Sequence, residues 1–261
     1  MTAAPILEVR GLGKSFGGLR VIDDLSFQIG RGERLALIGP NGAGKSTAFN
    51  LITGVHPVDA GQVWLGGEEI TTVPARLRIR KGLARTFQNI RLLPHLTVLE
   101  NVMIAQYAHA PGFFGMLQPV GLGRGNHWRM EARAALAETG LEGYAEQPAG
   151  ALPYGIQKRI ELVRALLAQP RVLLLDEPAA GLNPVETEAL QIALRAVSAR
   201  GVTLVVVEHD MQFICDLCER VVVLDFGCKI ADCATDGLHA DPQVREAYLG
   251  SDAQEAVLDA A

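Results

Sequence analysis

The residues best suited to chemistry in this chain gather in one glycine-rich stretch near its start. The stretch consists of Gly39, Pro40, Asn41, Gly42, Ala43, Gly44, Lys45, Ser46 and Thr47. Glycines let the backbone bend so that successive N–H groups point at one anion, and the lysine adds a positive charge that suits the β- and γ-phosphates. Because the serine hydroxyl can ligate Mg²⁺, the stretch predicts a site for a nucleoside triphosphate and its metal ion.

The segments around this stretch occur in the order that such a site requires. Residues 35–38 form an apolar run typical of a buried strand, and residues 47–53 follow a helical pattern. A strand, a glycine loop and a helix in succession direct the positive end of the helix dipole at bound phosphates. We therefore expect nucleotide binding, with the use made of the nucleotide decided by other residues.

Two carboxylates, Asp176 and Glu177, follow a second apolar run at residues 172–175. A buried strand would hold both acids rigidly beside the glycine loop. Asp176 suits a ligand of Mg²⁺ that acts together with Ser46, and Glu177 suits the base that orients and polarises an attacking water. The alternative, a solvated pair of acids at a strand end, is weakened by the presence of the glycine loop.

Three further side chains are candidates on weaker grounds. Gln88 ends a predicted strand at residues 84–87, where it can touch both Mg²⁺ and a water. His209 follows the apolar run 202–207 and can donate to a γ-phosphate, although a lone histidine is more often an ordinary loop residue. Phe16 lies 23 residues before Gly39 and can stack on adenine, or can equally be a core side chain in a loop.

Composition limits the class of protein. The chain has 261 residues, is 49% hydrophobic and carries a formal net charge of -5, which allows one large core with a subdomain and disfavours a nucleic-acid partner. Its first residues show no signal-peptide pattern, and no apolar run approaches the about 20 residues that a membrane span needs. We therefore expect a cytoplasmic chain that is soluble or bound at a membrane surface.

Two local clusters have an ordinary interpretation beside a functional one. Five basic residues lie close together, and we interpret them as a solvated helix face: Arg76, Arg78, Arg80, Lys81 and Arg85. Cys215 and Cys218 have a spacing that occurs in zinc sites. Their apolar neighbours follow a helical pattern, which favours thiols without a metal.

Hydrophobic patterning predicts an α/β fold. The opening third is rich in strands with antiparallel signals, and the later apolar runs, separated by helices, indicate a parallel sheet covered on both faces. The expected strands are residues 6–12, 25–29, 35–38, 62–65, 84–87, 172–175, 202–207 and 221–224, and the expected core helices are 74–81, 156–167 and one opened by Asn183-Pro184.

A helical insert is expected within this core. Thr97 and Glu100 form a capping box that predicts a helix from there to about residue 107, and a second helix is expected at 128–138. A glycine-rich loop should join them over residues 110–126, and a last helix should run over 241–249. The chain is thus expected as one domain, 1–261, with an α/β core at 1–90 and 160–250, a helical subdomain at about 91–160 and a tail at 251–261.

The chain resembles the ATP-binding cassette (ABC) ATPases over nearly its full length. The resemblance rests on the order of its motifs, which is an aromatic residue, the phosphate loop, a glutamine, Leu-x-x-Gly, Asp-Glu and a histidine. The resemblance implies a P-loop NTPase (RecA-like) core with an antiparallel β subdomain and an inserted α-helical subdomain. It implies ATP and Mg²⁺ as cofactors. Its functional positions fall on Phe16 for adenine stacking, Gly39 to Ser46 for the phosphate loop, Gln88 for the Q-loop, Asp176 for the Walker B acid, Glu177 for the catalytic glutamate and His209 for the switch histidine.

Four longer stretches are similar to the ATPase subunits of high-affinity branched-chain amino acid importers of the LivG type. They are residues 84–92, 177–184, 208–211 and 247–250. This resemblance implies a peripheral ATPase on the cytoplasmic face of the plasma (inner) membrane, which powers import through a separate permease. It implies a second ABC ATPase, identical or different, as dimer partner, and a periplasmic or extracellular binding protein as an indirect partner. The substrate stays open among branched-chain amino acids, amides, urea and aromatic acids.

Two positions depart from the family pattern. The signature Leu-Ser-Gly-Gly-Gln is here Leu-Pro-Tyr-Gly-Ile. The resemblance implies that Pro153, Tyr154 and Gly155 contribute to the ATP site of the opposite subunit. Because Pro153 lacks the serine hydroxyl and an N–H, we expect that contribution to be weakened but not abolished. The other departure is Asn183, where the family often has aspartate.

Three other functions fit the sequence less well. A soluble, ATP-switched interaction module acting on nucleic acid or the ribosome is the main alternative, but such proteins usually bring two cassettes or a long coiled coil, and neither is visible here. Glu177 and His209 argue against a nucleotide sensor without hydrolysis. A GTPase is disfavoured because the chain lacks an Asn-Lys-x-Asp motif.

Overall fold

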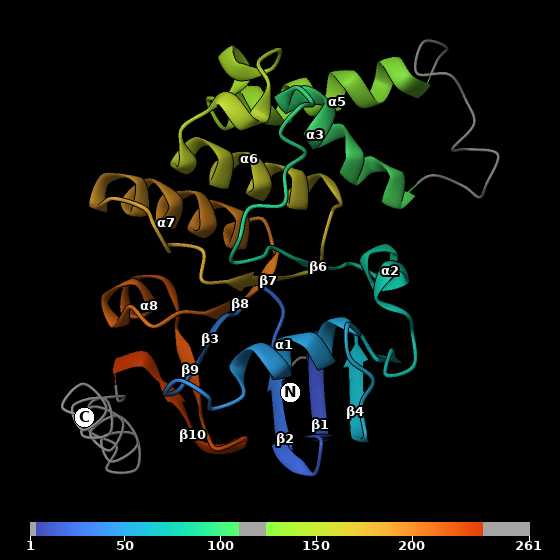
Figure 1. The fold of residues 1–261 in the computed structure, drawn as a ribbon, viewed down its shortest axis with the longest axis vertical. Helices are drawn as coiled ribbons and strands as arrows, with labels where there is room; N and C mark the ends of the chain where they lie inside the picture. The colour runs from blue at the N-terminus through green and yellow to red at the C-terminus, as the bar shows by residue number, and fades with distance from the viewer. Residues whose placement is uncertain (1–3, 110–123, 237–261) are drawn as a thin grey trace.

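A computed structural model describes residues 4–109 and 124–236, and these residues build two sheets with helices packed against them (Figure 1). The smaller sheet has four antiparallel strands in the order β2-β1-β4-β5. They are β1 (Leu7–Phe16), β2 (Leu19–Ile29), β4 (Ala60–Leu65) and β5 (Glu68–Glu69). The strands β1 and β2 are longer than predicted and meet at a turn of Gly17 and Gly18, both with positive φ, so Phe16 ends a strand and does not lie in a loop.

The larger sheet carries the carboxyl ends at which the candidate residues lie. Its order is β10-β9-β3-β8-β7-β6, with β9, β3, β8, β7 and β6 parallel and β10 antiparallel to β9. The strands are β3 (Arg34–Ile38), β6 (Leu83–Arg85), β7 (Val172–Asp176), β8 (Thr203–Val207), β9 (Arg220–Asp225) and β10 (Cys228–Ala234). Because β3, β8 and β7 are neighbours and parallel, the segments that follow residues 38, 176 and 207 all start at the carboxyl-terminal end of the larger sheet.

Both faces of this sheet are covered, as the continuous apolar runs predict. Leu35 and Leu37 of β3 pack toward α1 (Lys45–Thr53) and the smaller sheet, whereas Ala36 and Ile38 pack toward the opposite side. That opposite side is covered by α6 (Tyr154–Leu167), α7 (Pro184–Ala199) and α8 (Met211–Leu217). The period of two along a strand thus divides its side chains between two cores.

A third core is enclosed by α6 and four further helical segments, which are α3 (Val98–Met103), α5 (Arg124–Glu138), η3 (Glu142–Tyr144) and η4 (Ala149–Ala151). The 3₁₀ helix η2 (Ile104–His109) directly follows α3. The predicted capping box of Thr97 and Glu100 is present in both directions. The predicted helix is wrong beyond Met103, where the chain continues as a 3₁₀ helix, and α5 begins four residues before the predicted start.

Several predictions concern residues that lie outside the described part. These are most of the loop predicted at 110–126, the helix at 241–249 and the tail at 251–261. Within the described ranges, no helix combines the length and apolar character required to traverse a membrane.

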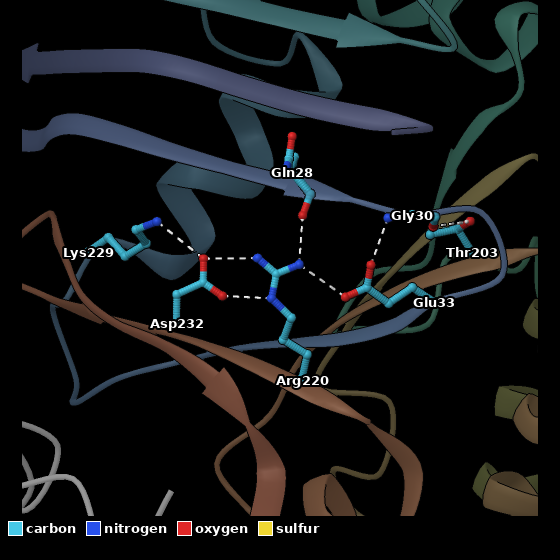
Figure 2. A network of polar contacts seen from close by, with 7 residues as sticks. All are labelled: Gln28, Gly30, Glu33, Thr203, Arg220, Lys229 and Asp232. Atoms are coloured by element: carbon cyan, nitrogen blue, oxygen red, sulfur yellow. Dashed lines mark hydrogen bonds and ion pairs between the residues drawn. The ribbon is translucent and has the colours of Figure 1, made fainter. Parts of the chain in front are cut away.

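An arginine network joins the edge of the larger sheet to the smaller one (Figure 2). Arg220 of β9 donates to Asp232 of β10 at 2.6 and 2.9 Å, to Glu33 at 3.1 Å and to the carbonyl of Gln28, the penultimate residue of β2, at 3.0 Å. The hydrogen bonds that Arg220 donates to Asp232 and Glu33 raise its pKa. The network fixes β10, which sequence patterning missed because its residues are mostly exposed or half-buried.

The basic run at residues 76–85 is not a uniformly solvated face, contrary to our interpretation. Arg78 of α2 (Ala75–Arg78) is 2% exposed and donates to the carbonyls of Leu51, Ile52, Thr71 and Val73. Burial lowers its pKa to about 10, which leaves the guanidinium charged at neutral pH. The 3₁₀ helix η1 (Ile79–Lys81) follows, so the predicted helix at 74–81 is present in two parts.

Candidate active site

The glycine stretch forms a cradle in which side chains are excluded at two positions. Gly39 has φ 151°, and a Cβ there would lie 2.1 Å from the carbonyl oxygen of Leu224. Gly44 has φ 100°, and its Cβ would lie 2.9 Å from the carbonyl oxygen of Val21. Gly44 is also the N-cap of α1, which begins at Lys45 without a side-chain cap. The first N–H groups of α1 are therefore free to bind an anion, as the sequence predicts.

Lys45 lies across this cradle. Its Nζ donates to the carbonyls of Gly39 at 2.6 Å and Pro40 at 2.9 Å. Burial lowers the pKa of the ammonium, and the negative charge of Glu177 acts in the opposite direction. The glycine loop and the tip of β7 therefore share one electrostatic environment, in which a cation stands ready for phosphate oxygens.

The two acids lie where β7 ends. Asp176 is its last residue and is 8% exposed, and Glu177 follows with φ 45°, in the left-handed region that residues with a side chain seldom adopt. The N–H of Glu177 donates to the carbonyl of Val207 at 2.9 Å, which ties the segment after β7 to the end of β8. Such a backbone conformation is typical of functional sites.

Gln88 meets Glu177 directly. The strand β6 ends at Arg85, not at residue 87 as predicted, and Thr86 still donates to Leu174 before the chain turns away. Gln88 lies in the segment beyond, and its Nε2 donates to the Glu177 carboxylate. The structure thus brings together two predicted site residues that are 89 positions apart in the sequence.

The residues expected at a magnesium ion have the right chemistry for one bound with phosphates. Asn50 lies one helical turn after Ser46, on the same face of α1. Arg85 donates to Asn50 at 2.7 Å and to Asp176 at 2.5 Å, so it joins that face to the tip of β7. The described residues contain no group of three or more His, Cys, Asp or Glu that could hold a metal ion. A hydroxyl, an amide and one carboxylate still suit Mg²⁺, which usually takes few protein ligands.

Two buried charged residues at the site escaped the sequence analysis. Lys158 of α6 is 6% exposed, and its Nζ donates to the carbonyl of Gln88 at 2.9 Å and lies 3.4 Å from that of Glu177. Glu208 is 2% exposed and accepts from the N–H groups of Ala179 at 2.8 Å and His209 at 3.2 Å. Burial lowers the pKa of Lys158 and raises that of Glu208.

The signal for these two residues was present but weak. Lys158 lies within a predicted amphipathic helix, and Glu208 directly follows a continuous apolar strand. Charged residues at such positions are usually solvated, so only the contacts formed by distant segments reveal that both are buried.

His209 and Phe16 lie at exposed positions. The His209 side chain is 73% exposed, with Nδ1 3.7 Å from the Glu208 carboxylate, and among the described residues it has no hydrogen bond to Gln88 or Glu177. The Phe16 ring is 43% exposed and packs edge-on against His56 at 5.3 Å. Phe16 pairs with Leu19 of β2, two residues before Val21, whose carbonyl lies against Gly44.

The signature segment forms the N-terminus of α6. The helix begins at Tyr154, two residues earlier than predicted, and Pro153 is its N-cap with φ −55° and ψ 148°, so it does not lie within the first turn. No side chain caps this helix, and Tyr154 is 42% exposed. A Cβ on Gly155 would lie 2.1 Å from a carboxylate oxygen of Glu186, so a larger residue there would displace the Glu186 side chain.

Comparisons with known proteins agree with a nucleotide-binding site. The family described as ABC transporter matches residues 22–180. The chain is 40% identical to the high-affinity branched-chain amino acid transport ATP-binding protein BraF of Pseudomonas aeruginosa, over 94% of this chain and 98% of that protein. It is 36% identical to the similarly described LivG of Escherichia coli (strain K12), with the same coverage.

Solved structures show the same fold. A nucleotide-free ATP-binding cassette from an ABC transporter superposes with a TM-score of 0.84 at 28% identity, covering 94% of this chain and 99% of that one. A cassette in the ADP conformation matches with the same TM-score and identity, over 95% of this chain and 100% of that one.

The fold and the glycine loop define a nucleotide-binding ATPase of the cassette type. The chain belongs to the ABC transporter family, as the matched residues and the relatives show. It is an ATP-binding subunit whose activity is ATP hydrolysis coupled to transport. The predicted fold class, a P-loop NTPase core with an antiparallel β subdomain and inserted helices, is confirmed.

Proposed function

We propose that this chain powers the import of branched-chain or related amino acids through a separate membrane permease. The observation that carries the proposal is the full-length similarity to two branched-chain amino acid transport ATP-binding proteins, at 40% and 36% identity. The geometry supports it, because the glycine loop, the acids after β7 and Gln88 lie at one edge of the larger sheet.

In this proposal residues 39–47 hold the phosphates of ATP. Ser46, Asp176 and Gln88 hold Mg²⁺, which when bound would neutralise charge on the phosphate oxygens. When ATP binds, the Lys45 ammonium would leave the carbonyls of Gly39 and Pro40 and donate to the β- and γ-phosphates instead. The adenine stacks on Phe16, whose ring is exposed at the end of β1.

Glu177 is the proposed base for the attacking water. Its carboxylate is held by Gln88, which can therefore signal to the base what docks beside the Q-loop. His209, exposed after β8, is the proposed donor to the γ-phosphate. The uncapped start of α6 at Pro153, Tyr154 and Gly155 is the part offered to the ATP of a second cassette, identical or different.

The assembly follows from these roles. Two cassettes would hold two ATP molecules between them on the cytoplasmic face of the plasma (inner) membrane, as peripheral subunits. The permease docks beside Gln88 and the helical segment of about 91–160, which we propose as a subdomain on the α/β core of 1–90 and 160–250. A periplasmic or extracellular binding protein acts indirectly, through the permease, and no nucleic acid takes part.

The role of Glu177 is tested with Glu177→Gln in the full chain. The variant should bind ATP, hydrolyse it about 10²–10⁴-fold more slowly because the water loses its base, and accumulate an ATP-bound dimer. Glu188→Gln, the same change at an exposed position of α7, is the matched control and should hydrolyse ATP at the wild-type rate. Undiminished turnover in Glu177→Gln would remove Glu177 from the reaction.

The substrate class is tested by transport. The tagged chain is purified from membranes with its permease, reconstituted in vesicles with ATP, and assayed for uptake of labelled leucine, phenylalanine, an aliphatic amide and urea. Uptake of leucine above the others, lost in Glu177→Gln, is the expected result. Uptake of urea or the amide alone would contradict the proposed substrate, and the absence of any co-purifying permease would contradict the transport function itself.

A further inference from the structure

A groove of about 440 Å³ lies among α5, α6 and α7, and none of the residues proposed to bind ATP belongs to its described lining. Figure 1 shows α6 between the other two helices. We name it the three-helix groove. In the part of the chain that the structure describes, its apolar lining is entirely aliphatic and includes Leu162, Leu166 and Ile192. The volume lies within the range of about 300–1,000 Å³ that is typical of small-molecule sites.

Charged side chains of both signs stand beside this aliphatic lining. Glu138 is the last residue of α5, and Arg200 follows the last residue of α7. The Nη1 of Arg200 donates to the Glu138 carboxylate at 3.0 Å, and the two side chains are 69% and 59% exposed. Because exposed ion pairs contribute little to stability, a ligand can take both partners at small cost.

A second guanidinium lines the groove from α6. Arg159 is half-buried, and its Nη2 donates to the carbonyl of Thr139, the residue after α5. Among the described residues Arg159 pairs with no carboxylate, and its Nε and Nη1 form no hydrogen bond. The groove thus combines an aliphatic surface, one carboxylate and two guanidinium groups, of which one lacks an acidic partner.

An aliphatic α-amino acid matches this combination. Its carboxylate suits Arg159 and Arg200, its ammonium suits Glu138, and its side chain covers the aliphatic lining. A fatty acid would attract the arginines and leave Glu138 without a partner. An aromatic amino acid would find no aromatic side chain in the described lining for a ring contact.

We propose that the three-helix groove binds an aliphatic α-amino acid, and that this binding slows ATP turnover. The inference rests on the proposed function, because import would deliver such an amino acid to the cytoplasmic side, where the cassette lies. The chain would then respond to the accumulation of what the complex imports.

Helix α6 connects the groove to the proposed base. Arg159 directly follows Lys158, whose Nζ donates to the carbonyl of Gln88 at 2.9 Å and lies 3.4 Å from that of Glu177. A ligand that contacts α5, α6 and α7 together restricts the movement of α6 relative to its neighbours. It therefore also restricts the segment that carries Gln88.

Binding is tested by calorimetry on the full chain with L-leucine as the probe. The wild type should show saturable binding, and Arg200→Gln and Glu138→Gln should each weaken it about tenfold because each removes a charge that the zwitterion uses. Arg195→Gln and Glu188→Gln, the same changes at exposed positions of α7 outside the groove lining, are the matched controls and should bind like the wild type. All four positions are exposed, so each variant should keep the Tm of the wild type.

The class of ligand is tested with two analogues of leucine. Isocaproate lacks the ammonium group and isoamylamine lacks the carboxylate, so each should bind at least about tenfold more weakly than leucine. Tighter binding of isocaproate or decanoate than of leucine would assign the groove to fatty acids and overturn the inference. Absence of saturable leucine binding by the wild type overturns it as well.

The effect on the reaction is measured as ATP turnover of the full chain at rising leucine concentration. Saturating leucine should lower kcat about fivefold, a typical size for coupling between sites, and change the KM for ATP less. Arg200→Gln should need about tenfold more leucine for the same effect. Leucine binding without any change in turnover overturns the regulatory role.

Uptake in reconstituted vesicles separates this inference from the proposed function. A complex that takes up leucine, built with a chain that itself binds none, overturns the inference and leaves the proposed function standing. A chain that binds leucine in the groove, in a complex that imports no amino acid, overturns the proposed function and leaves the amino acid site standing.

Discussion

Replacing Arg78 by leucine is expected to destabilise the junction between α1 and α2. The guanidinium is 2% exposed and lies where α1 ends, with hydrogen bonds of 2.8 Å to the carbonyl of Val73, 2.7 Å to that of Thr71 and 3.1 Å to that of Leu51. It also donates to the carbonyl of Ile52. A cation at the C-terminal end of a helix is favoured by the helix dipole as well.

The magnitude follows from the acceptors that lose their donor. Leu51 retains a bond from the N–H of Gly54, so the carbonyls of Ile52, Thr71 and Val73 are those left unsatisfied. Each buried unsatisfied acceptor costs about 1–3 kcal/mol, and the variant recovers part of this because it no longer buries a charge. We expect a net loss of about 3 kcal/mol in the free energy of unfolding, which lowers Tm by about 6–12 °C in a chain of this size.

Chemical and thermal unfolding of the full chain measure this loss. Arg76→Leu removes an exposed arginine from the same helix and should change the free energy of unfolding by no more than about 0.5 kcal/mol. Hydrogen exchange should become faster at the N–H groups of Val55 and His56. These two residues lie just beyond the end of α1 and donate to the carbonyl of Asn50. A loss below about 0.5 kcal/mol in Arg78→Leu, or an equal loss in Arg76→Leu, would refute this account of Arg78.

Three further outcomes are expected. Pro153→Ser should raise ATP turnover of the assembled complex severalfold, since a hydroxyl is restored at the start of α6; turnover well below the wild type would count against a weakened signature. Lys158→Met should lower turnover at least about tenfold because the contact with the Glu177 carbonyl is lost, and it should alter kcat more than the KM for ATP. Asp232→Asn should destabilise the chain by about 0.5–1 kcal/mol at pH 7, where Arg220 loses a charged acceptor in an exposed ion pair. Burial opposes the low pKa of Asp232, but hydrogen bonds keep it below 3.8; its stabilisation is therefore present above pH 3.8, and urea unfolding should show the difference from the wild type shrinking as the pH falls below that value.

The parallel sheet was predictable because its strands are buried on both sides. Residues 35–38, 172–175 and 204–207 are apolar without interruption, and all of them are buried. The strand β10 gives no such signal, since most of its side chains are exposed or half-buried and Asp232 is held by an arginine from the neighbouring strand. The end of α3 was also hidden, because the change from α to 3₁₀ geometry at Met103 leaves no mark in the composition.

The glycine loop was predictable for a different reason, which is that its requirements are local. Gly39 and Gly44 have φ values of 151° and 100°, which residues with a side chain rarely adopt, so glycine at these two positions follows from the local backbone. The contact between Gln88 and Glu177 depends on two segments 89 residues apart, and the sequence predicted Gln88 only as a strand-end side chain that can touch Mg²⁺ and a water. Arg85 was interpreted as solvated because it stands among other basic residues, and only its contact with Asp176 corrects that.

Charged side chains of α6 link the movement of this helix to the segment that carries Gln88. Three bonds fasten residues 88–91 to α6: Lys158 donates to the Gln88 carbonyl, Arg91 donates to Glu161, and Arg164 donates to the Arg91 carbonyl. Apolar residues of similar volume would often hold two elements together at least as strongly as buried ions do. Polar contacts are instead directional, so a small shift of α6 must either carry the segment with it or break bonds. Because Gln88 also holds the Glu177 carboxylate, a movement of α6 cannot leave the geometry of the proposed base unchanged.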